Sequence, residues 1–399
     1  MRRLHPVKAV VEDAYRALGG LDALPVEERP LRGAAGGYAA EKVVSTRRLP
    51  PYPKSVVDGY AVRSEDVLPA SPSTPVRLRL LDALVRPGPL PEVTLGAGEA
   101  VRIETGGYLP RGADAAVPVE DTVEEAGTVL VYRRVARWEN VSMPGEEYEP
   151  GITIVDRGWR VDGRRLAALA LEGRERLRVY RLAARVLNVG DELLGAAAGY
   201  PAYTHLIVED WLRGLGFAVA ETEFMGDDRE AIASWLSRGD AWLSVAMGGT
   251  SMGGHDYTVR AIESLEPDYM VHGVAVQPGK TACIAVKDGR LIAAISGLPV
   301  AALSSLELLL RPLLARLGLQ IPERPRVRAR LARRITVKMG VAGFARVRLE
   351  RRGGELVATP LMTGGSGSLK SLVAADGYVY VPEESEGFDE GEEVEVRLF

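Results

Sequence analysis

Residues 246–257 form the stretch of the chain whose residue types are best suited to chemistry. An apolar segment, 241–245, leads into this loop, which contains four glycines, two small hydroxyl side chains and a carboxylate. Glycine lacks the Cβ that would hold an anion away from the backbone, and successive amide N–H groups in such a turn form an anion-binding concavity. At the end of the loop, Asp256 is placed to hold a divalent cation against a bound phosphate. The pattern predicts a phosphate-binding loop, and a tight strand-to-helix turn without a ligand is the alternative.

Two more glycine-bearing acidic turns follow apolar segments in the same part of the chain. One is residues 189–193, with the sequence Val-Gly-Asp-Glu-Leu, and the other is residues 225–228, with Met-Gly-Asp-Asp. Ligands of open α/β sheets bind beyond the carboxyl ends of the strands. We therefore expect the three turns to form one acidic pocket. Its candidate acidic residues are Asp191, Glu192, Asp227, Asp228 and Asp256.

A second group of candidates follows the proline-rich segment 50–53. The segment 54–60 combines a lysine, a serine, an aspartate and a tyrosine, a composition suited to gripping a polar ligand, although Asp-Gly turns are often structural. Glycine turns at 105–114 and 140–147 carry further carboxylates. Such turns repel phosphate unless Mg²⁺ lies between them, and Mg²⁺ is usually bound by one or two carboxylates. These turns predict metal binding, with solvated surface turns as the alternative.

Residues 276–281 match a nucleotide-binding P-loop only in part. That loop needs a glycine five positions before Gly279, where this chain has Val274, and Pro278 removes an amide from the run. The sequence therefore disfavours a P-loop nucleotide hydrolase, while Lys280 can still offer a point charge to a phosphate or oxyanion. The HExxH pattern of zinc proteases is absent, and the four histidines are widely scattered.

The composition limits the class and the location of the protein. A chain of 399 residues is long enough for two to four domains, and its net charge of −4 gives no overall attraction to nucleic acid or membranes. The apolar runs are too short for a membrane span, and we expect no secretion signal. Cys283 is the only cysteine, which excludes an intramolecular disulfide and favours a reducing cytoplasm. The scarcity of asparagine and glutamine favours a thermophile.

Hydrophobic patterning divides the chain into regions of different secondary structure. A helix is predicted from about residue 6 until Gly19 and Gly20 stop it, and residues 30–145 predict a small β-rich lobe. Residues 181–320 alternate strand and helix as a layered α/β domain does, and residues 327–399 return to short strands that predict a barrel or sandwich. The predicted strands include 75–80, 128–132, 184–189, 218–224, 242–247 and 291–295, and the predicted helices include 164–171, 203–215, 229–237 and 300–317.

Several motifs occur in a fixed order along the chain. They are PPYPKSVVDGYAV, TGGYLPRGADAAVPVED, GDEL, GGTSMGGHDYT, PGK and SGLP, followed by the C-terminal segment 365–399. Together they resemble the molybdopterin molybdenumtransferases, the family of MoeA and the gephyrin E domain. The resemblance implies an elongated homodimer of α/β multidomain subunits whose active site is shared between the subunits. The implied domains are residues 1–28 with 150–180 (helical and extended), 29–149 (an inserted β-rich lobe), 181–321 (a three-layer α/β molybdopterin-binding domain) and 322–399 (a C-terminal β-barrel).

The resemblance also implies an activity and a set of site residues. Members of the family insert molybdate, or in a thermophile tungstate, into adenylylated molybdopterin and release AMP with the assistance of Mg²⁺. The implied catalytic residues are Asp58, Asp228, Asp256 and Lys280, and the implied metal ligands are Asp191, Glu192, Asp228 and Asp256. The implied pterin-binding residues are Lys54, Ser55, Gly190, Gly248, Gly249, Ser251, Gly253, Gly297 and Pro299.

The chain departs from the family pattern at three places in the implied site. Val189 stands where the family usually has a hydroxyl side chain, residues 300–302 are Val-Ala-Ala in place of Gly-Asn-Pro, and Ser142 replaces an arginine. Loss of one oriented donor can lower turnover by about two to three orders of magnitude. A paralogue that binds or carries the pterin without transferring metal is therefore an alternative. A domain that only adenylylates molybdopterin is another.

Overall fold

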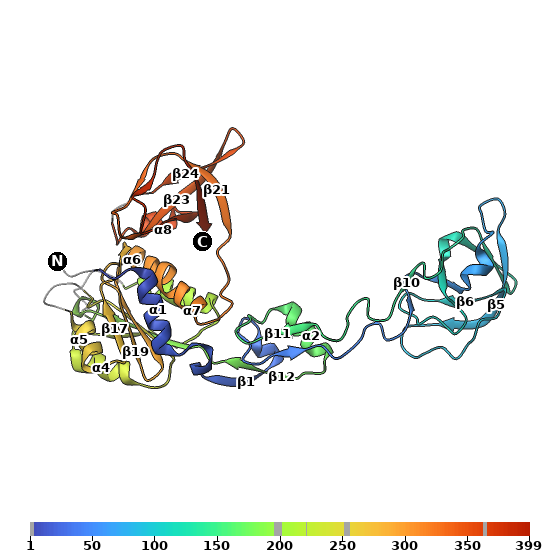
Figure 1. Ribbon diagram of the computed structural model, residues 1–399, viewed down its shortest axis with the longest axis horizontal. Coiled ribbons are helices and arrows are strands. Elements are labelled where there is room, and N and C mark those ends of the chain that lie inside the picture. Colours follow the sequence, from blue (N-terminus) through green and yellow to red (C-terminus); the bar gives the residue numbers. More distant parts are fainter. Residues whose placement is uncertain (1–3, 195–201, 221, 251–255, 362–364) are drawn as a thin grey trace. The chain divides into compact units, whose positions relative to one another are not determined.

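The computed structural model describes residues 4–194, 202–220, 222–250, 256–361 and 365–399 (Figure 1). The chain forms two compact units. The core unit contains Met1–Lys42, Val155–Ala167 and Arg174–Phe399, and the inserted unit contains Val43–Ile154 with Ala168–Gly173. The four domain boundaries implied by the sequence resemblance stay predictions. In the described residues, no helix is both long and apolar enough to cross a membrane.

The inserted unit is built on a six-stranded sheet. Its strand order is β7-β4-β6-β5-β9-β8, and side chains such as Tyr60, Leu78 and Val117 fill the core on one face. The bounds are β3 (Lys54–Ser55), β4 (Gly59–Val62), β5 (Val76–Val85), β6 (Glu99–Ile103), β7 (Ala115–Pro118), β8 (Thr122–Glu125), β9 (Thr128–Val131) and β10 (Val141–Ser142). The predicted strands 75–80 and 128–132 correspond to β5 and β9, which confirms the β-rich lobe.

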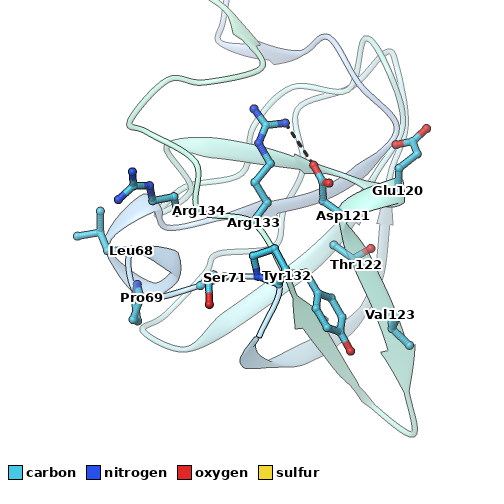
Figure 2. A pocket seen from close by; sticks show the side chains of 12 residues that line it. Leu68, Pro69, Ser71, Glu120, Asp121, Thr122, Val123, Tyr132, Arg133 and Arg134 are labelled. Atoms are coloured by element: carbon cyan, nitrogen blue, oxygen red, sulfur yellow. Dashed lines mark hydrogen bonds and ion pairs between the residues drawn. The ribbon is translucent and has the colours of Figure 1, made fainter. Parts of the chain in front are cut away.

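A hollow of about 590 Å³ opens on the inserted unit beside β8 and β9 (Figure 2). Of the two arginines in its lining, Arg133 and Arg134, Arg133 is paired with Asp121 at 3.2 Å and with Glu139 at 2.8 Å. The residues that line this hollow include none of the predicted site residues.

The core unit contains a three-layer α/β domain around a seven-stranded sheet. The strand order is β14-β13-β16-β20-β19-β17, and β15 also pairs with β13. Strands β13, β16 and β20 are parallel, whereas β19 and β17 are antiparallel to their neighbours. The bounds are β13 (Ala183–Val189), β14 (Ala218–Val219), β15 (Glu223–Met225), β16 (Leu243–Met247), β17 (Tyr269–His272), β19 (Cys283–Lys287) and β20 (Arg290–Ile295). Between β17 and β19 the chain forms β18 (Val276–Gln277), which pairs with a strand of the C-terminal part instead of with this sheet.

Helices cover both faces of this sheet because successive residues of each strand point to opposite faces. Val186 of β13 packs in one apolar cluster with α1, α3, α6 and α7, and Leu187 packs in another with α4 and α5. The bounds are α1 (Val7–Leu18), α3 (Thr204–Gly214), α4 (Arg229–Ser237), α5 (Tyr257–Ser264), α6 (Pro299–Ser305) and α7 (Arg311–Arg316). The three-layer arrangement predicted for this region is confirmed.

Two sequence predictions in this domain need correction. The strand predicted at 218–224 is divided into β14 and β15, and the Thr222 hydroxyl between them donates to Glu209 of α3. The helix predicted at 300–317 is interrupted by a wider π-helical turn, Leu306–Leu310. That turn contains Glu307, a buried carboxylate whose partners come from several directions, and a uniform apolar helix pattern does not anticipate it.

The C-terminal part of the core unit is a closed five-stranded barrel. Strand β23 pairs with both β24 and β25, and the ring closes through β21 and β27. The bounds are β21 (Arg326–Leu331), β23 (Ala342–Arg352), β24 (Glu355–Pro360), β25 (Gly377–Val381) and β27 (Glu393–Leu398), with a short helix α8 (Leu369–Val373). The predicted β-barrel is confirmed.

The other strands and α-helices are β1 (Val26–Pro30), β2 (Val43–Val44), β11 (Thr153–Val155), α2 (Gly163–Leu171), β12 (Arg176–Tyr180), β22 (Ile335–Thr336) and β26 (Gly387–Phe388).

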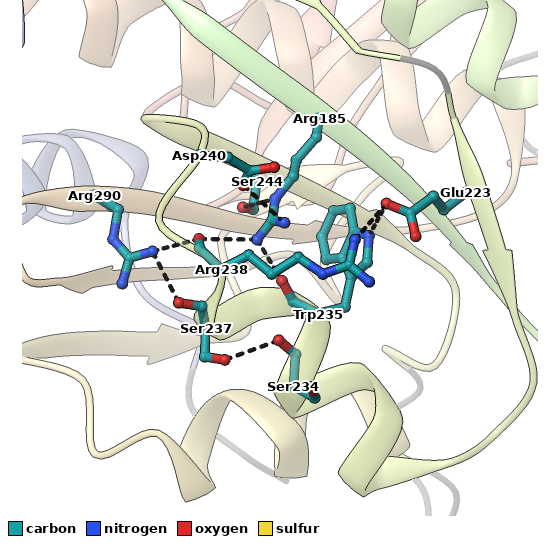
Figure 3. A network of polar contacts seen from close by, with 9 residues as sticks. All are labelled: Arg185, Glu223, Ser234, Trp235, Ser237, Arg238, Asp240, Ser244 and Arg290. Atoms are coloured by element: carbon teal, nitrogen blue, oxygen red, sulfur yellow. Dashed lines mark hydrogen bonds and ion pairs between the residues drawn. The ribbon is translucent and has the colours of Figure 1, made fainter.

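One buried arginine ties α4 to the sheet (Figure 3). Arg185 of β13 is 2% exposed, and its guanidinium carbon lies 4.2 Å from the centre of the Trp235 ring. Its Nη2 donates to the carbonyl oxygens of Trp235 and Arg238, and its Nη1 lies 3.0 Å from Oδ1 of Asp240. Burial lowers the pKa of Arg185. The charge is tolerated because the last carbonyls of a helix have no partner within the helix and lie at the negative end of its dipole.

We predict that Arg185→Leu lowers the free energy of unfolding of the α/β domain by about 2–4 kcal/mol, because the carbonyl oxygens of Trp235 and Arg238 each lose one of their donors inside the fold. Differential scanning calorimetry measures the change. The control is Arg328→Ala, which removes an arginine 82% exposed in its side chain and paired with Glu393 at the surface. The control should cost less than about 1 kcal/mol. Equal losses for the two variants would contradict the structural role of Arg185.

Candidate functional site

The glycine loop after β16 approaches its neighbours too closely for any side chain. Gly248 has φ of 97°, and a Cβ on it would lie 2.2 Å from the carbonyl oxygen of Val189. Gly249 has φ of 61°, and a Cβ there would lie 2.5 Å from Oγ1 of Thr258. The loop is fixed on its other side because the Gly248 amide donates to the carbonyl oxygen of Ile295 at 3.1 Å. Glycine is therefore required at both positions, as the sequence predicted.

The three acidic turns lie at one edge of the sheet. In the parallel pairing, Val189 of β13 is opposite Met225 of β15, and Asn188 is opposite Met247 of β16. The first two turns also bond to each other. The Gly190 amide donates to the Met225 carbonyl oxygen at 3.0 Å, and the Asp227 amide donates to Oδ1 of Asp191 at 3.0 Å.

The four predicted metal ligands have different surroundings. Oδ1 of Asp228 accepts from the amides of Glu230 and Ala231 and so caps α4, a role that sequence reasoning did not assign. Asp191 and Glu192 are exposed. Among the described residues, no three histidine, cysteine or acidic side chains lie close enough to hold a metal ion.

Asp256 differs from the other three because it is buried. Its side chain stands at the start of α5 with the residue 7% exposed, and its Oδ1 has no hydrogen-bond partner among the residues that the structure describes. A buried carboxylate oxygen without a partner is costly. Asp256 is therefore the carboxylate of this group whose surroundings best fit a bound cation.

A pocket of about 700 Å³ opens where the α/β domain meets the barrel within the core unit. From the α/β domain it is lined by Gly248, Gly249, Thr250, residues 276–281, residues 296–298 and Ala301. From the barrel region it is lined by Lys338, Val341, Arg346, Gly365 and Ser366. Of the residues predicted from the sequence, Gly248, Gly249, Lys280 and Gly297 are brought together here.

The lining of this pocket is basic. Lys280 and Lys338 are exposed and have no ion pair with the described residues. Arg346 is 2% exposed, and burial lowers the pKa of its guanidinium. No carboxylate lines the pocket in the part of the chain that the structure describes. Backbone amides, the two exposed lysines and the guanidinium of Arg346 give the lining a positive potential, which favours an anionic ligand.

The barrel cations Lys338 and Arg346 were missed from the sequence. They lie more than 50 residues from Lys280, and neither belongs to a motif. Only the closure of the barrel against the α/β domain brings them to the pocket, so no local sequence signal could have found them.

The remaining predicted pterin-binding residues are distributed as follows. The carbonyl oxygen of Gly297 accepts from Oγ1 of Thr204 at 2.7 Å, and Pro299 is buried at the start of α6. Gly190 begins the turn after β13. Ser251 and Gly253 lie outside the described residues.

Asp58, Lys54 and Ser55 belong to the inserted unit. Oδ1 of Asp58 accepts from the Thr105 amide at 2.6 Å, and hydrogen bonds from the backbone and side chain of Thr105 hold the pKa of Asp58 below its usual range. Lys54 Nζ pairs with Glu147 at 2.6 Å, and the buried Ser55 hydroxyl donates to the Val57 carbonyl oxygen at 2.7 Å. Asp58 therefore presents an exposed, ionised carboxylate, whereas Ser55 stabilises its own turn.

Three family models match the chain in succession. The MoeA N-terminal region (domain I and II) matches residues 7–173. A probable molybdopterin binding domain matches residues 185–316, and the MoeA C-terminal region (domain IV) matches residues 328–399. These ranges cover both units described above.

Two proteins and one crystal structure of a protein of molybdopterin biosynthesis are similar to this chain over nearly its full length. A putative molybdopterin biosynthesis protein of Methanocaldococcus jannaschii is 30% identical over 420 residues, which span 100% of this chain and 99% of that protein. A molybdopterin molybdenumtransferase of Staphylococcus epidermidis is 27% identical over 91% of this chain and 88% of its own length. The crystal structure of the molybdopterin biosynthesis MoeA protein from Pyrococcus horikosii is 31% identical, covers 99% of both chains and has a TM-score of 0.75.

We predict that Gly248→Ala destabilises the core unit by about 2 kcal/mol more than Gly353→Ala does. Both substitutions place a Cβ at positive φ, which costs roughly 1–2 kcal/mol. Only the Cβ at position 248 also meets a carbonyl oxygen, because nothing lies within 4 Å of position 353. Thermal unfolding of the two variants measures the difference. Equal destabilisation would mean that the loop relaxes without strain and does not need glycine for its close approach.

Proposed function

This chain belongs to the MoeA family, and from that premise we propose that it inserts molybdate or tungstate into adenylylated molybdopterin with release of AMP. The observation that carries the proposal is the basic pocket in which the glycine loop of β16 meets Lys280, Lys338 and Arg346. A phosphorylated pterin offers the negative charge that such a pocket favours. Its phosphate can approach the amides of Gly248 and Gly249 because neither residue carries a Cβ.

The residues of the pocket would act mainly by binding and orienting the substrate. The glycine amides and Lys280 would hold the pterin phosphate, and the barrel cations would attract the oxyanion or the AMP moiety. AMP leaves as an anion, so positioned donors and cations that stabilise the growing charge contribute most of the rate. Mg²⁺ would supply further charge neutralisation. Its predicted ligands are Asp191, Glu192, Asp228 and Asp256, of which Asp256 has the buried, unpartnered oxygen that suits it.

Asp58 is proposed to complete the site across a homodimer, from the inserted unit of the second subunit. The resemblance of its motif to the family supports this assignment. So does the exposure of its carboxylate, which is held ionised by the hydrogen bonds of Thr105. Lys54 would act beside it, although its ammonium group is already paired with Glu147.

A carrier that binds the pterin without transferring metal is the second candidate. The observation that favours it is the start of α6, where Val300, Ala301 and Ala302 are buried as the first turn of the helix. Ala301 lines the pocket. A methyl group there cannot donate the hydrogen bond that an asparagine side chain would offer.

Calorimetric titration with adenylylated molybdopterin, followed by molybdate or tungstate and Mg²⁺, distinguishes the two candidates. We expect binding followed by AMP release, which chromatography detects. Binding without release under either oxyanion would identify a carrier. If the protein does not bind the pterin at all, both candidate functions are wrong.

We predict that Asp58→Asn lowers AMP release by at least about two orders of magnitude and leaves the melting temperature unchanged. The asparagine oxygen can still accept from the Thr105 amide, so only the charge is lost. Asp66→Asn is the matched control, because Asp66 also accepts from a backbone amide, that of Gly98 at 2.8 Å. The control should release AMP at the wild-type rate. A large fall in melting temperature for Asp58→Asn would show instead that the residue is structural.

A further inference from the structure

Glu307 is a buried carboxylate that the proposed function does not use. It lies in the π-helical turn between α6 and α7, and it is 1% exposed. Wider turns of this kind inside helices often occur at functional positions. A charged group at such depth is stable only where other groups satisfy both of its oxygens.

Four side chains donate to Glu307, and we call the five residues the Glu307 cluster. Arg311 donates in a fork, from Nε to Oε2 at 2.7 Å and from Nη2 to Oε1 at 3.0 Å. Arg324 donates to Oε1 from Nη2 at 2.7 Å and from Nε at 3.1 Å. Trp211 Nε1 donates to Oε1 at 2.8 Å, and the Tyr378 hydroxyl donates to Oε2 at 3.1 Å.

The Glu307 cluster keeps its carboxylate ionised. Burial by itself would raise the pKa of Glu307, but the hydrogen bonds and charges of Arg311 and Arg324 outweigh burial and hold the pKa below its ordinary value. Burial, together with the nearby Glu307 charge, raises the pKa of Tyr378 to about 12. Tyr378 therefore remains a hydrogen-bond donor at every pH at which the protein is used.

The members of the cluster come from separate parts of the core unit. Trp211 belongs to α3, Arg311 to α7, and Arg324 to the segment that leads from α7 to the barrel. Tyr378 belongs to β25 of the barrel. One carboxylate thus joins the α/β domain, the connecting segment and the barrel.

The cluster lies one strand away from the basic pocket. Tyr378 of β25 is directly opposite Arg346 of β23 in the antiparallel register, and Arg346 lines the pocket. A second junction acts on β23 itself, because β18 of the α/β domain pairs in parallel with β23 at Ala342 and Gly343. The chain continues from β18 into the loop that carries Lys280. The two junctions together determine how far Arg346 lies from the glycine loop.

We propose that Glu307 is a positioning residue, which holds the barrel against the α/β domain through Tyr378 and thereby sets the place of Arg346 in the ligand pocket. Its effect on ligand affinity rests on the proposed function. A displacement of about 1 Å at a binding group can cost about two orders of magnitude in rate. A change in the Glu307 cluster can therefore affect the pocket by displacing Arg346, although no residue of the cluster contacts the ligand.

Two variants that each remove one hydrogen bond to Glu307 test the proposal. Tyr378→Phe removes the bond from the barrel, and Trp211→Phe removes a bond made entirely within the α/β domain. For Tyr378→Phe we expect the dissociation constant for adenylylated molybdopterin to rise about fivefold or more. For Trp211→Phe we expect a change smaller than about twofold, even if the two melting temperatures fall equally. Equal changes in the dissociation constant would overturn the proposal.

A distance measurement that needs no ligand separates this proposal from the proposed function. Cys283, the only native cysteine, is fully buried, and burial raises the pKa of its thiol to about 12, so it does not react with a spin label in the folded protein. Spin labels are therefore attached through two substitutions, Arg260→Cys on α5 and Arg328→Cys on β21. The distribution of distances between the labels should broaden with Tyr378→Phe and stay narrow with Trp211→Phe. An unchanged distribution in Tyr378→Phe would overturn the proposal that Glu307 holds the barrel against the α/β domain through Tyr378. If the wild type does not bind the pterin, the proposed function is wrong. The comparison of the two distance distributions still tests the positioning role of Glu307.

Discussion

At the carboxyl edge of the β13–β16–β20 pairing, backbone atoms approach so closely that no side chain fits between them. Gly248 is fixed between the Val189 and Ile295 carbonyl oxygens, because a Cβ on it would lie 2.2 Å from the first and its amide donates to the second at 3.1 Å. The parallel register forces this approach, since Met247 pairs with both Asn188 and Ile295. A ligand in the pocket at this edge can therefore reach the backbone amides of the glycine loop as well as the side chains of Lys280, Lys338 and Arg346. The acidic turns, the glycine loop and the basic pocket all depend on that packing.

The local parts of the architecture could be predicted from the sequence. Alternation of strand and helix identified the α/β domain, and the glycines after β16 predicted a loop whose conformation side chains would forbid. The prediction failed where a tertiary partner overrides a local pattern. The apolar helix after Pro299 is broken at Glu307, whose partners Arg324 and Tyr378 lie 17 and 71 residues further along the chain. Lys338 was missed for the same reason, because it reaches the pocket only through the docking of the barrel.

Two buried charges in the core unit are satisfied by different means, and the difference bears on their roles. Arg185 uses the terminal carbonyls of α4, groups of one small region, so its effect stays within the α/β domain. Glu307 uses side chains from three regions, which the chain must bring together before the charge is satisfied. Removal of one partner from a buried charged group is far more costly than replacement of the whole set. Glu307 therefore couples the folding of the barrel to that of the α/β domain, whereas Arg185 does not.

Residues of opposite charge stand before and after the glycine loop, an arrangement that suits the anion and the cation of the proposed function. Lys280 and Arg346 face the pocket, whereas the acidic turns lie along the sheet edge that leads into the same loop. Asp256 follows the glycine loop in the chain and stands at the start of α5. In the proposed function, a divalent cation held by Asp256 would offset the repulsion between this carboxylate and an anion bound to the amides of Gly248 and Gly249. A bare anion-binding carrier has no use for a buried, unpartnered Asp256 oxygen. Its presence favours the transferase, even though the start of α6 lacks the polar side chains that the family pattern would place there.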